Sequence, residues 1–329
     1  MHLENMETTN MNNLFLVWKK YQRRPEVFAP LLDSQLQFIP HLFKSKYLRP
    51  LDYLIKLVVS IKQIMTTKPD FVIAQCPPTY SVIPALLTGV PYIIDGHNPL
   101  FQVEMWKKIP LTKYLIKNAQ AIIVHNSEIL PLAESIYPSV RLFNICNPLE
   151  VISSSQTQRQ DKQILVISSF DPWDEPVDLM IECMEKLNEY TFIVTADINK
   201  LPSKVSKRLQ QLSNVRLTGF LSVEDYHSVL CTSLAALVLT TSEATQPEGA
   251  CEALSSDTQL IVSNTSLTKQ LFGEWAVLVD NSLESIIKAV RSLSPLKLDL
   301  SSYRDQWNSS VQKEIDQLRQ FMDECKNKQ

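Results

Sequence analysis

Several features that mark particular protein classes are missing from this sequence of 329 residues. No stretch approaches the roughly 20 uninterrupted apolar residues that a membrane-spanning helix needs, so we expect no such span. Residues 1–13 are polar and lack the apolar core of a secretory signal. The six cysteines form no Cys-x-x-Cys pair and have no metal-ligand spacing. Together these absences predict a protein of the reducing cytoplasm.

A strong charge of either sign is missing as well, since the formal net charge is −3. Residues 1–150 hold 15 Lys and Arg against 11 Asp and Glu, or +4, and the remainder holds 17 against 24, or −7. The mildly basic first half is weak evidence for an anionic partner. Nothing in it amounts to a nucleic-acid-binding patch, and we expect no nucleic-acid partner.

What is present predicts two α/β domains. A chain of this length, 45% hydrophobic, is too long for one ordinary core and suits two domains of about 150 residues each. Apolar runs alternate with helical patterns in both halves, which predicts parallel, doubly wound sheets. The predicted strands are 14–18, 71–75, 91–95, 121–125 and 141–146 in the first half, and 164–168, 190–196, 215–219, 234–240, 259–262 and 276–279 in the second.

The domain boundary is predicted in the polar stretch 153–163, which is low in apolar residues. We therefore expect a first Rossmann-like domain over 1–152 and a second over 153–300. Residues 301–325 follow a helical pattern, so 301–329 is expected to be a closing helix.

A basic amphipathic helix is predicted over 42–66. Its apolar positions recur every three or four residues and are flanked by lysines and arginines. Such a helix either packs on a sheet or lies on anionic lipid, so peripheral contact with the inner membrane face is one of two readings. The apolar residues are Leu51, Leu54, Ile55, Val58, Ile61, Ile64 and Met65, and the basic ones are Lys44, Lys46, Arg49, Lys56 and Lys62.

A second basic cluster directly follows the first predicted strand. It holds Lys19, Lys20, Arg23 and Arg24. Cations at the carboxyl end of a strand could hold a phosphate or an acidic acceptor. The alternative is a solvated loop.

The stretch 234–257 gives the clearest indication of a ligand site. It reads as a buried strand, then a polar turn, then a helix start that carries Glu248 and Glu252. Residues four apart share one face of a helix. A helix N-terminus at the carboxyl end of a parallel strand is where anionic ligands bind in open α/β sheets.

These residues resemble the nucleotide-sugar signature of the family-4 retaining glycosyltransferases, which have the GT-B fold. Two glutamates of that family hold the donor, and Glu252-Ala253-Leu254 matches the second of them. The first should fall at Ala244, so Glu243 is the nearest candidate and Glu248 the next. The family also has a catalytic histidine after a strand of the first domain, and His97 in Asp95-Gly96-His97-Asn98-Pro99 corresponds to it; a turn histidine that bonds its neighbours is the alternative.

The resemblance places the donor in the second domain. The stretch Thr218-Gly219-Phe220-Leu221 is similar to the element after which the family holds the nucleotide base. Ser169 and Phe170 lie in the loop that faces the donor diphosphate. Thr245, Gln246, Pro247, Glu248 and Gly249 form the turn whose backbone amides could hold part of its charge.

One departure from the family concerns the loop 168–178. The family has an arginine and a lysine there, whereas this loop has no base and contains Asp171, Asp174 and Glu175. The diphosphate charge would have to be neutralised by the amides of residues 245–249 or by the basic cluster after the first strand. Otherwise the protein no longer catalyses transfer.

The resemblance implies two Rossmann-like domains that face a central cleft, with the closing helix 301–329 crossing back to the N-terminal domain. It also implies retaining transfer of a hexose from a nucleotide sugar, such as UDP-glucose. The acceptor would be a saccharide or a lipid-linked oligosaccharide in polysaccharide biosynthesis. No Asp-x-Asp triplet is present, and we expect no metal cofactor. A catalytically silent GT-B partner or scaffold protein and a nucleotide-sugar 2-epimerase are the alternatives.

Overall fold

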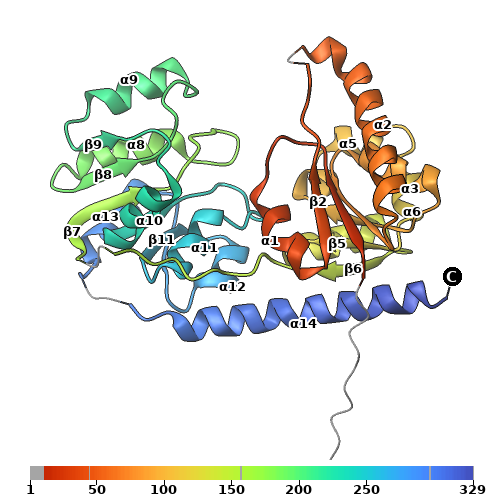
Figure 1. Ribbon diagram of the computed structural model, residues 1–329. Coiled ribbons are helices and arrows are strands. Elements are labelled where there is room, and N and C mark those ends of the chain that lie inside the picture. The colour runs from red at the N-terminus through yellow and green to blue at the C-terminus, as the bar shows by residue number, and fades with distance from the viewer. Residues whose placement is uncertain (1–10, 44, 156–157, 296–297, 329) are drawn as a thin grey trace, which may run out of the picture. The chain divides into compact units, whose positions relative to one another are not determined.

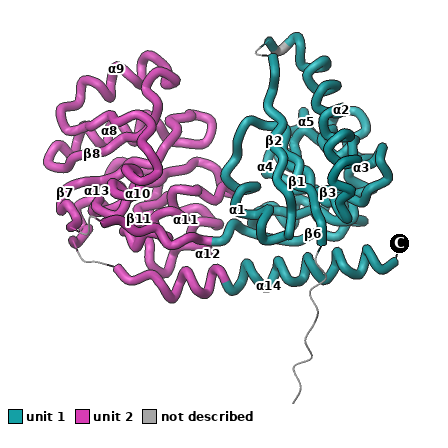
Figure 2. The backbone as a smooth tube through the Cα atoms, in the orientation of Figure 1, with its two compact units in different colours: residues 1–148, 309–329 teal, residues 149–308 magenta. Residues whose placement is uncertain are grey.

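The computed structural model describes residues 11–43, 45–155, 158–295 and 298–328. The chain divides into two compact units, drawn in different colours in Figure 2. Unit 1 comprises Met1–Pro148 together with Ser309–Gln329, and unit 2 comprises Leu149–Asn308. The sequence placed these divisions after residues 152 and 300. Each unit is built on one six-stranded parallel sheet with helices on its faces, which confirms the predicted α/β class (Figure 1).

The sheet of unit 1 has the strand order β2-β1-β3-β4-β5-β6. Its edge strand β2 was not expected, because the sequence SQLQF contains few apolar residues. The strands are β1 (Asn13–Val17), β2 (Ser34–Phe38), β3 (Val72–Cys76), β4 (Tyr92–Gly96), β5 (Ala121–Val124) and β6 (Arg141–Asn144). The α-helices are α1 (Arg23–Leu31), α2 (Arg49–Thr67), α3 (Ile83–Thr88), α4 (Asn98–Gln102), α5 (Glu104–Lys108), α6 (Thr112–Lys117) and α7 (Ile129–Ile136).

The central strands of unit 1 are buried along their whole length. Parallel sheets are covered on both faces, so their strands read as continuous apolar runs rather than as an alternation. Two buried polar residues lie near the carboxyl ends of these strands, Gln75 in β3 and Asp95 in β4. A buried polar group needs a partner, so we expect polar side chains to interact with one another at the carboxyl ends of these strands.

The buried face of α2 is not the apolar face that the sequence predicts for a helix packed on a sheet. Of the expected apolar row, only Ile64 is buried. The other buried residues of the helix are Asp52, Lys56 and Ser60, which are polar. Hydrophobicity alone therefore gives the wrong inner face for this helix.

The sheet of unit 2 has the strand order β12-β11-β10-β7-β8-β9. Neighbouring residues of one strand point to opposite faces, so Ile164 and Val166 of β7 pack in one core cluster and Leu165 in another. The strands are β7 (Gln160–Val166), β8 (Thr191–Val194), β9 (Val215–Leu217), β10 (Ser233–Val238), β11 (Gln259–Ser263) and β12 (Val277–Val279). The helices are α8 (Val177–Lys186), α9 (Ser203–Gln211), α10 (Val223–Thr232), α11 (Glu248–Ser255), α12 (Ser266–Phe272) and α13 (Leu283–Ser292).

The last helix, α14 (Ser301–Lys326), contributes residues to both units. Within unit 2, the side-chain amide of Asn308 accepts from the Leu149 N–H at 2.8 Å and donates to the Leu149 carbonyl at 2.9 Å. Within unit 1, Arg319 pairs with Asp33 at 3.1 Å. Among the helices of the described residues, none combines the length and apolar character required to cross a bilayer.

Candidate functional site

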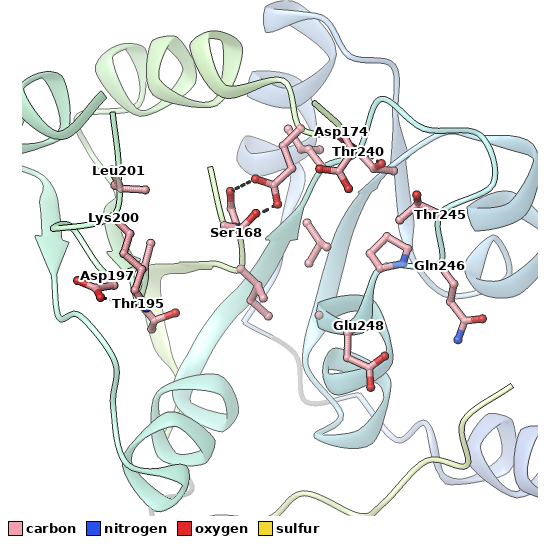
Figure 3. A pocket seen from close by; sticks show the side chains of 18 of the residues that line it. Ser168, Asp174, Thr195, Asp197, Lys200, Leu201, Thr240, Thr245, Gln246 and Glu248 are labelled. Carbon is pink, nitrogen blue, oxygen red and sulfur yellow. Dashed lines mark hydrogen bonds and ion pairs between the residues drawn. The ribbon is translucent and has the colours of Figure 1, made fainter. Parts of the chain in front are cut away.

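The strand order of unit 2 predicts where a ligand can bind. The chain runs from β7 outward through β8 and β9 and then returns to β10 on the other side of β7. In an open α/β sheet, the point where the strand order reverses leaves a crevice at the carboxyl ends of the strands. A cavity of about 470 Å³ lies there, lined by residues that follow β7, β8 and β10 and by the start of α11 (Figure 3).

The loop after β7 is stabilised by the carboxylate of Glu175, a residue of the same loop. Glu175 accepts hydrogen bonds from the Ser168 hydroxyl at 2.7 Å, the Ser169 N–H at 3.1 Å and the Asp171 N–H at 3.0 Å. Two of these donors are backbone amides of the kind that bind phosphate in related loops. Ser169, an expected donor-binding residue, lines the cavity. Phe170 does not line it; its backbone is left-handed (φ 55°) and its side chain is buried in the core.

The cavity lining is predominantly acidic. Asp174, Glu175, Asp197 and Glu248 line it, whereas Lys200 is the cation among the described lining residues. Burial raises the pKa of Asp174, and the neighbouring charges of Glu175 and Asp171 raise it further. A ligand with a diphosphate would therefore meet little positive charge here.

The turn before α11 lies against the cavity. Thr245, Gln246, Pro247, Glu248 and Gly249 all line it, and Figure 3 shows the first two beside the start of the helix. Gly249 is required by packing, because a Cβ atom at this position would lie 2.7 Å from Cγ2 of Ile167 at the end of β7. The missing side chain lets the first turn of α11 approach the strand end closely.

The three candidate glutamates have different environments. Glu248 is exposed and lines the cavity. Glu243 accepts from the Ser266 N–H at 3.0 Å and so caps α12. The Glu252 carboxylate accepts from the Tyr226 hydroxyl, and burial together with this carboxylate raises the pKa of Tyr226. Of the three, Glu248 alone is among the residues that line the cavity, within the described chain.

The loop after β9 contributes an exposed ring to the cavity. Phe220 lines it and is 76% exposed, whereas Gly219, with φ of 66°, and Leu221 do not line it. The ammonium of Lys200 lies 4.9 Å from the centre of the Phe220 ring and 3.4 Å from the Asp197 carboxylate. Sequence reasoning missed Asp197 and Lys200, although they follow a predicted strand at its carboxyl end, where ligands bind in such sheets.

In unit 1, the corresponding edge of the sheet holds a buried charged cluster. Asp95 is fully buried; one of its oxygens lies 3.1 Å from Nε of Arg24 and 3.0 Å from Nε2 of His125, and the other lies 3.3 Å from Nε2 of His97. Burial alone would raise the pKa of Asp95, but Arg24 and His125 hold it well below its usual range. The carboxylate is therefore charged near neutral pH. It accepts a hydrogen bond from His125, and His97 lies beside its other oxygen.

His97 is the residue directly before α4, and its backbone N–H donates to the Cys76 carbonyl at 2.9 Å. Its Nε2 lies 2.6 Å from the side-chain nitrogen of Gln75. Burial lowers the pKa of His97, and Asp95 only partly opposes this. Burial, with the charge of Arg24 next, lowers the pKa of His125 to about 3. Both rings are thus neutral near pH 7.

The four basic residues after β1 are not equivalent. The guanidinium of Arg24 is buried, donates to Asn147 at 2.6 Å and to the Ile145 carbonyl at 2.9 Å, and is committed to these partners and to Asp95. Lys19, Lys20 and Arg23 are exposed. The ammonium of Lys19 donates to Gln22 at 2.7 Å.

Asp95, His97 and His125 have the donor types of a metal site, and their ligand atoms lie within 4.8 Å of one another. The same carboxylate already binds the Arg24 guanidinium. A cation placed beside it would be repelled by this fixed positive charge, so the residues fit a charge-paired cluster better than a metal site.

Comparison with known proteins gave matches in structure alone. No family model matches the sequence, and no curated protein matches it. The chain is similar in structure to HepE of Anabaena in complex with UDP and glucose, with 13% identity, coverage of 97% of this chain and 100% of that one, and a TM-score of 0.67. It is also similar to sucrose-phosphate synthase of Thermosynechococcus elongatus, with 9% identity, 94% coverage of both chains and a TM-score of 0.64.

A third similar structure is the UDP-GlcNAc 2-epimerase of Methanocaldococcus jannaschii, with 12% identity, coverage of 92% of this chain and 99% of that one, and a TM-score of 0.56. At these identities the likeness concerns the fold. Two Rossmann-like domains with parallel six-stranded sheets, matched over nearly the whole chain, show that this protein has the GT-B fold.

Proposed function

We propose that this protein is a retaining glycosyltransferase that moves a hexose from a nucleotide sugar, such as UDP-glucose, to a saccharide or lipid-linked acceptor in polysaccharide biosynthesis. The observation that carries the proposal is the cavity of unit 2, where β7, β8 and β10 end and α11 begins. This is the crevice in which nucleotides bind in doubly wound sheets, and the helix N-terminus favours anionic groups. HepE, a protein of the same fold, has been seen in complex with UDP and glucose.

Within unit 2, the lining residues suit the parts of such a donor. The exposed ring of Phe220 offers a stacking surface for a base. Glu248 can accept hydrogen bonds from sugar hydroxyls, and Glu252, four residues along the same helix, is our candidate for the ribose. We prefer Glu248 to Glu243 as the first glutamate because Glu243 is engaged at the start of α12.

In unit 1, we assign the catalytic role to His97. Its neutral imidazole can donate one hydrogen bond and accept another, and its Nε2 lies beside the Gln75 amide at 2.6 Å. In the proposed reaction the bond from the anomeric carbon to the diphosphate breaks and a bond to the acceptor oxygen forms on the same face. The leaving diphosphate takes the acceptor proton. Metal independence is a separate part of the proposal, motivated by the lack of an Asp-x-Asp triplet.

The test is donor hydrolysis and sugar transfer with UDP-, GDP- and TDP-hexoses, measured for the wild type and for His97→Ala and Glu252→Gln. The glutamine keeps an acceptor for Tyr226 but removes the negative charge. Both variants should lose most of the activity, while circular dichroism should show that both are folded. Glu274→Ala, an exposed glutamate of unit 2, is the matched control and should keep its activity. Full activity in both site variants would end the assignment.

The acidic lining of the cavity favours a second candidate, a catalytically silent GT-B partner or scaffold protein. Four carboxylates and one ammonium are a poor environment for a diphosphate. Calorimetric titration with UDP and UDP-sugars separates the two functions, because a scaffold need not bind either ligand.

The likeness to UDP-GlcNAc 2-epimerases motivates a third candidate, a nucleotide-sugar 2-epimerase. This reaction needs no acceptor. Incubation with UDP-GlcNAc alone, followed by analysis of the sugar product, would reveal the 2-epimer if the protein has this activity, whereas a transferase would give only unchanged donor or free sugar.

A further inference from the structure

The outer face of α2 is apolar along most of its length. Leu51, Leu54, Val58 and Met65 are 46%, 56%, 59% and 66% exposed. Their spacing of three, four and seven residues places them in one row on the helix surface, which we call the outer row. Figure 1 shows α2 at the edge of unit 1.

The inner face of α2 is polar and is bound to the end of β1. The ammonium of Lys56 donates to the Trp18 carbonyl at 2.8 Å, and the indole N–H of Trp18 donates to the Ser60 hydroxyl at 3.1 Å. Asp52 accepts from the Leu42 N–H at 2.9 Å. Rotating the helix to bury its outer row would break these bonds and leave buried polar groups without partners. The exposure of the outer row is therefore fixed by the fold.

The charges around the outer row have one sign. Residues 42–69 contain six Lys and Arg and one acidic residue, Asp52. Of the six, Lys56 is buried on the inner face and Arg49 pairs with Asp52 at 3.6 Å. Asp52 is buried and faces inward. Lys62 is exposed beside the outer row. A second copy of the same helix would bring like charges together, whereas an anionic surface would complement them.

We propose that α2 docks unit 1 on a lipid bilayer that contains anionic headgroups, with the outer row inserted at the boundary between headgroups and acyl chains. An exposed apolar row flanked by cations is the combination that interfacial helices use. Each basic residue near an anionic bilayer adds to the attraction. The inference concerns unit 1 alone and does not depend on sugar transfer.

The experiment is co-sedimentation of the full chain with vesicles of phosphatidylcholine, with and without phosphatidylglycerol. The wild type should bind the anionic vesicles and not the neutral ones. Leu54→Glu with Val58→Glu should weaken binding at least about tenfold, because it replaces two inserted apolar groups by charges. Lys62→Gln should weaken it about fivefold through the loss of one positive charge.

Val223→Glu is the matched control, since Val223 is 71% exposed on α10 of unit 2. It should leave vesicle binding unchanged, and circular dichroism should show that all variants are folded. Equal binding of the double variant and the wild type would overturn the proposal, as would absence of wild-type binding. A lipid-free dimer that the double variant disrupts would also overturn it, since a second copy would then cover the outer row.

Discussion

The two units place different chemistry at the same position in their sheets. Both sheets reverse their strand order near the middle, and both have polar residues at the carboxyl ends of the central strands. In unit 1 these residues are buried and paired with one another around Asp95. In unit 2 they surround a cavity. One topology thus supports a closed, charge-paired cluster and an open, acidic pocket.

The difference shows which properties each site owes to its surroundings. The Asp95 cluster lies out of water, so its protonation is set by burial and by Arg24. The cavity residues are partly exposed, so solvent screens their charges. We expect substitutions in the unit 1 cluster to change stability strongly, and substitutions around the unit 2 cavity to act first on ligand binding.

The largest loss of unfolding free energy is expected from Asp95→Asn. This substitution keeps the shape of the side chain but leaves the buried Arg24 guanidinium without a counter-charge. Breaking a buried pair in this way costs roughly 3–5 kcal/mol of unfolding free energy. Urea unfolding of the variant would measure the loss.

Asp305→Asn, on the exposed surface of α14 in unit 2, is the matched control for this change. It removes the same charge from a solvated position and should leave the unfolding free energy within roughly 0.5 kcal/mol of wild type. Similar values for the two variants would contradict the view that the unit 1 cluster is a buried charge network.

Lowering the pH is expected to reduce the free energy of unfolding by a smaller amount. His125 has a pKa of about 3 when folded and an ordinary value near 6.5 when unfolded. Between these values the unfolded chain binds a proton that the folded protein does not, so stability falls as the pH falls. The slope is roughly 1.4 kcal/mol per pH unit for this one histidine. His97 acts in the same direction, because its folded pKa is also lowered.

The pH dependence can be measured by urea unfolding at several values between about pH 7 and pH 5. His125→Gln keeps a donor toward Asp95 but removes the titrating group, so its unfolding free energy should fall less steeply with pH. An equal slope in both proteins would show that other groups govern the acid sensitivity.

The smallest effect is expected in unit 2 from Gly249→Ala. The new methyl group would meet Ile167 and push the first turn of α11 away from β7. Overpacking of this kind costs roughly 1–3 kcal/mol. Because the displaced turn lines the cavity, nucleotide affinity should fall as well, which calorimetry with UDP would detect.

Ile167→Ala removes Cγ2 and Cδ1, two of the three nearest atoms, and serves as the partner in a double-mutant cycle. The two substitutions together should cost less than the sum of the single costs, because they share one contact. Additive costs would mean that the strain arises elsewhere.

The sequence was informative about the fold because its apolar runs are long and regularly spaced. The buried strands of unit 1 and of unit 2 lie close to their predicted positions. The strand β2 was missed because its residues are mostly polar, and an edge strand needs little burial. The inner face of α2 was missed because its partners, above all Trp18, are supplied by a strand about 40 residues away.

The candidate site was predictable in part. The turn 245–249, which lines the cavity, could be proposed as a ligand site because a helix start after a buried strand is a local pattern. The capping role of Glu243 and the tyrosine partner of Glu252 depend on contacts between separate helices, which no local pattern reveals. The Arg24–Asp95–His125 cluster escaped for the same reason, since its members come from three distant segments.

The polar inner face of α2 has a practical consequence for work with the protein. Since the outer row makes little contribution to the core, hydrophilic replacements there should leave the fold intact. They should also reduce self-association of the protein at high concentration. Such variants would give a well-behaved reagent for crystallisation without altering the architecture of the sheet beneath.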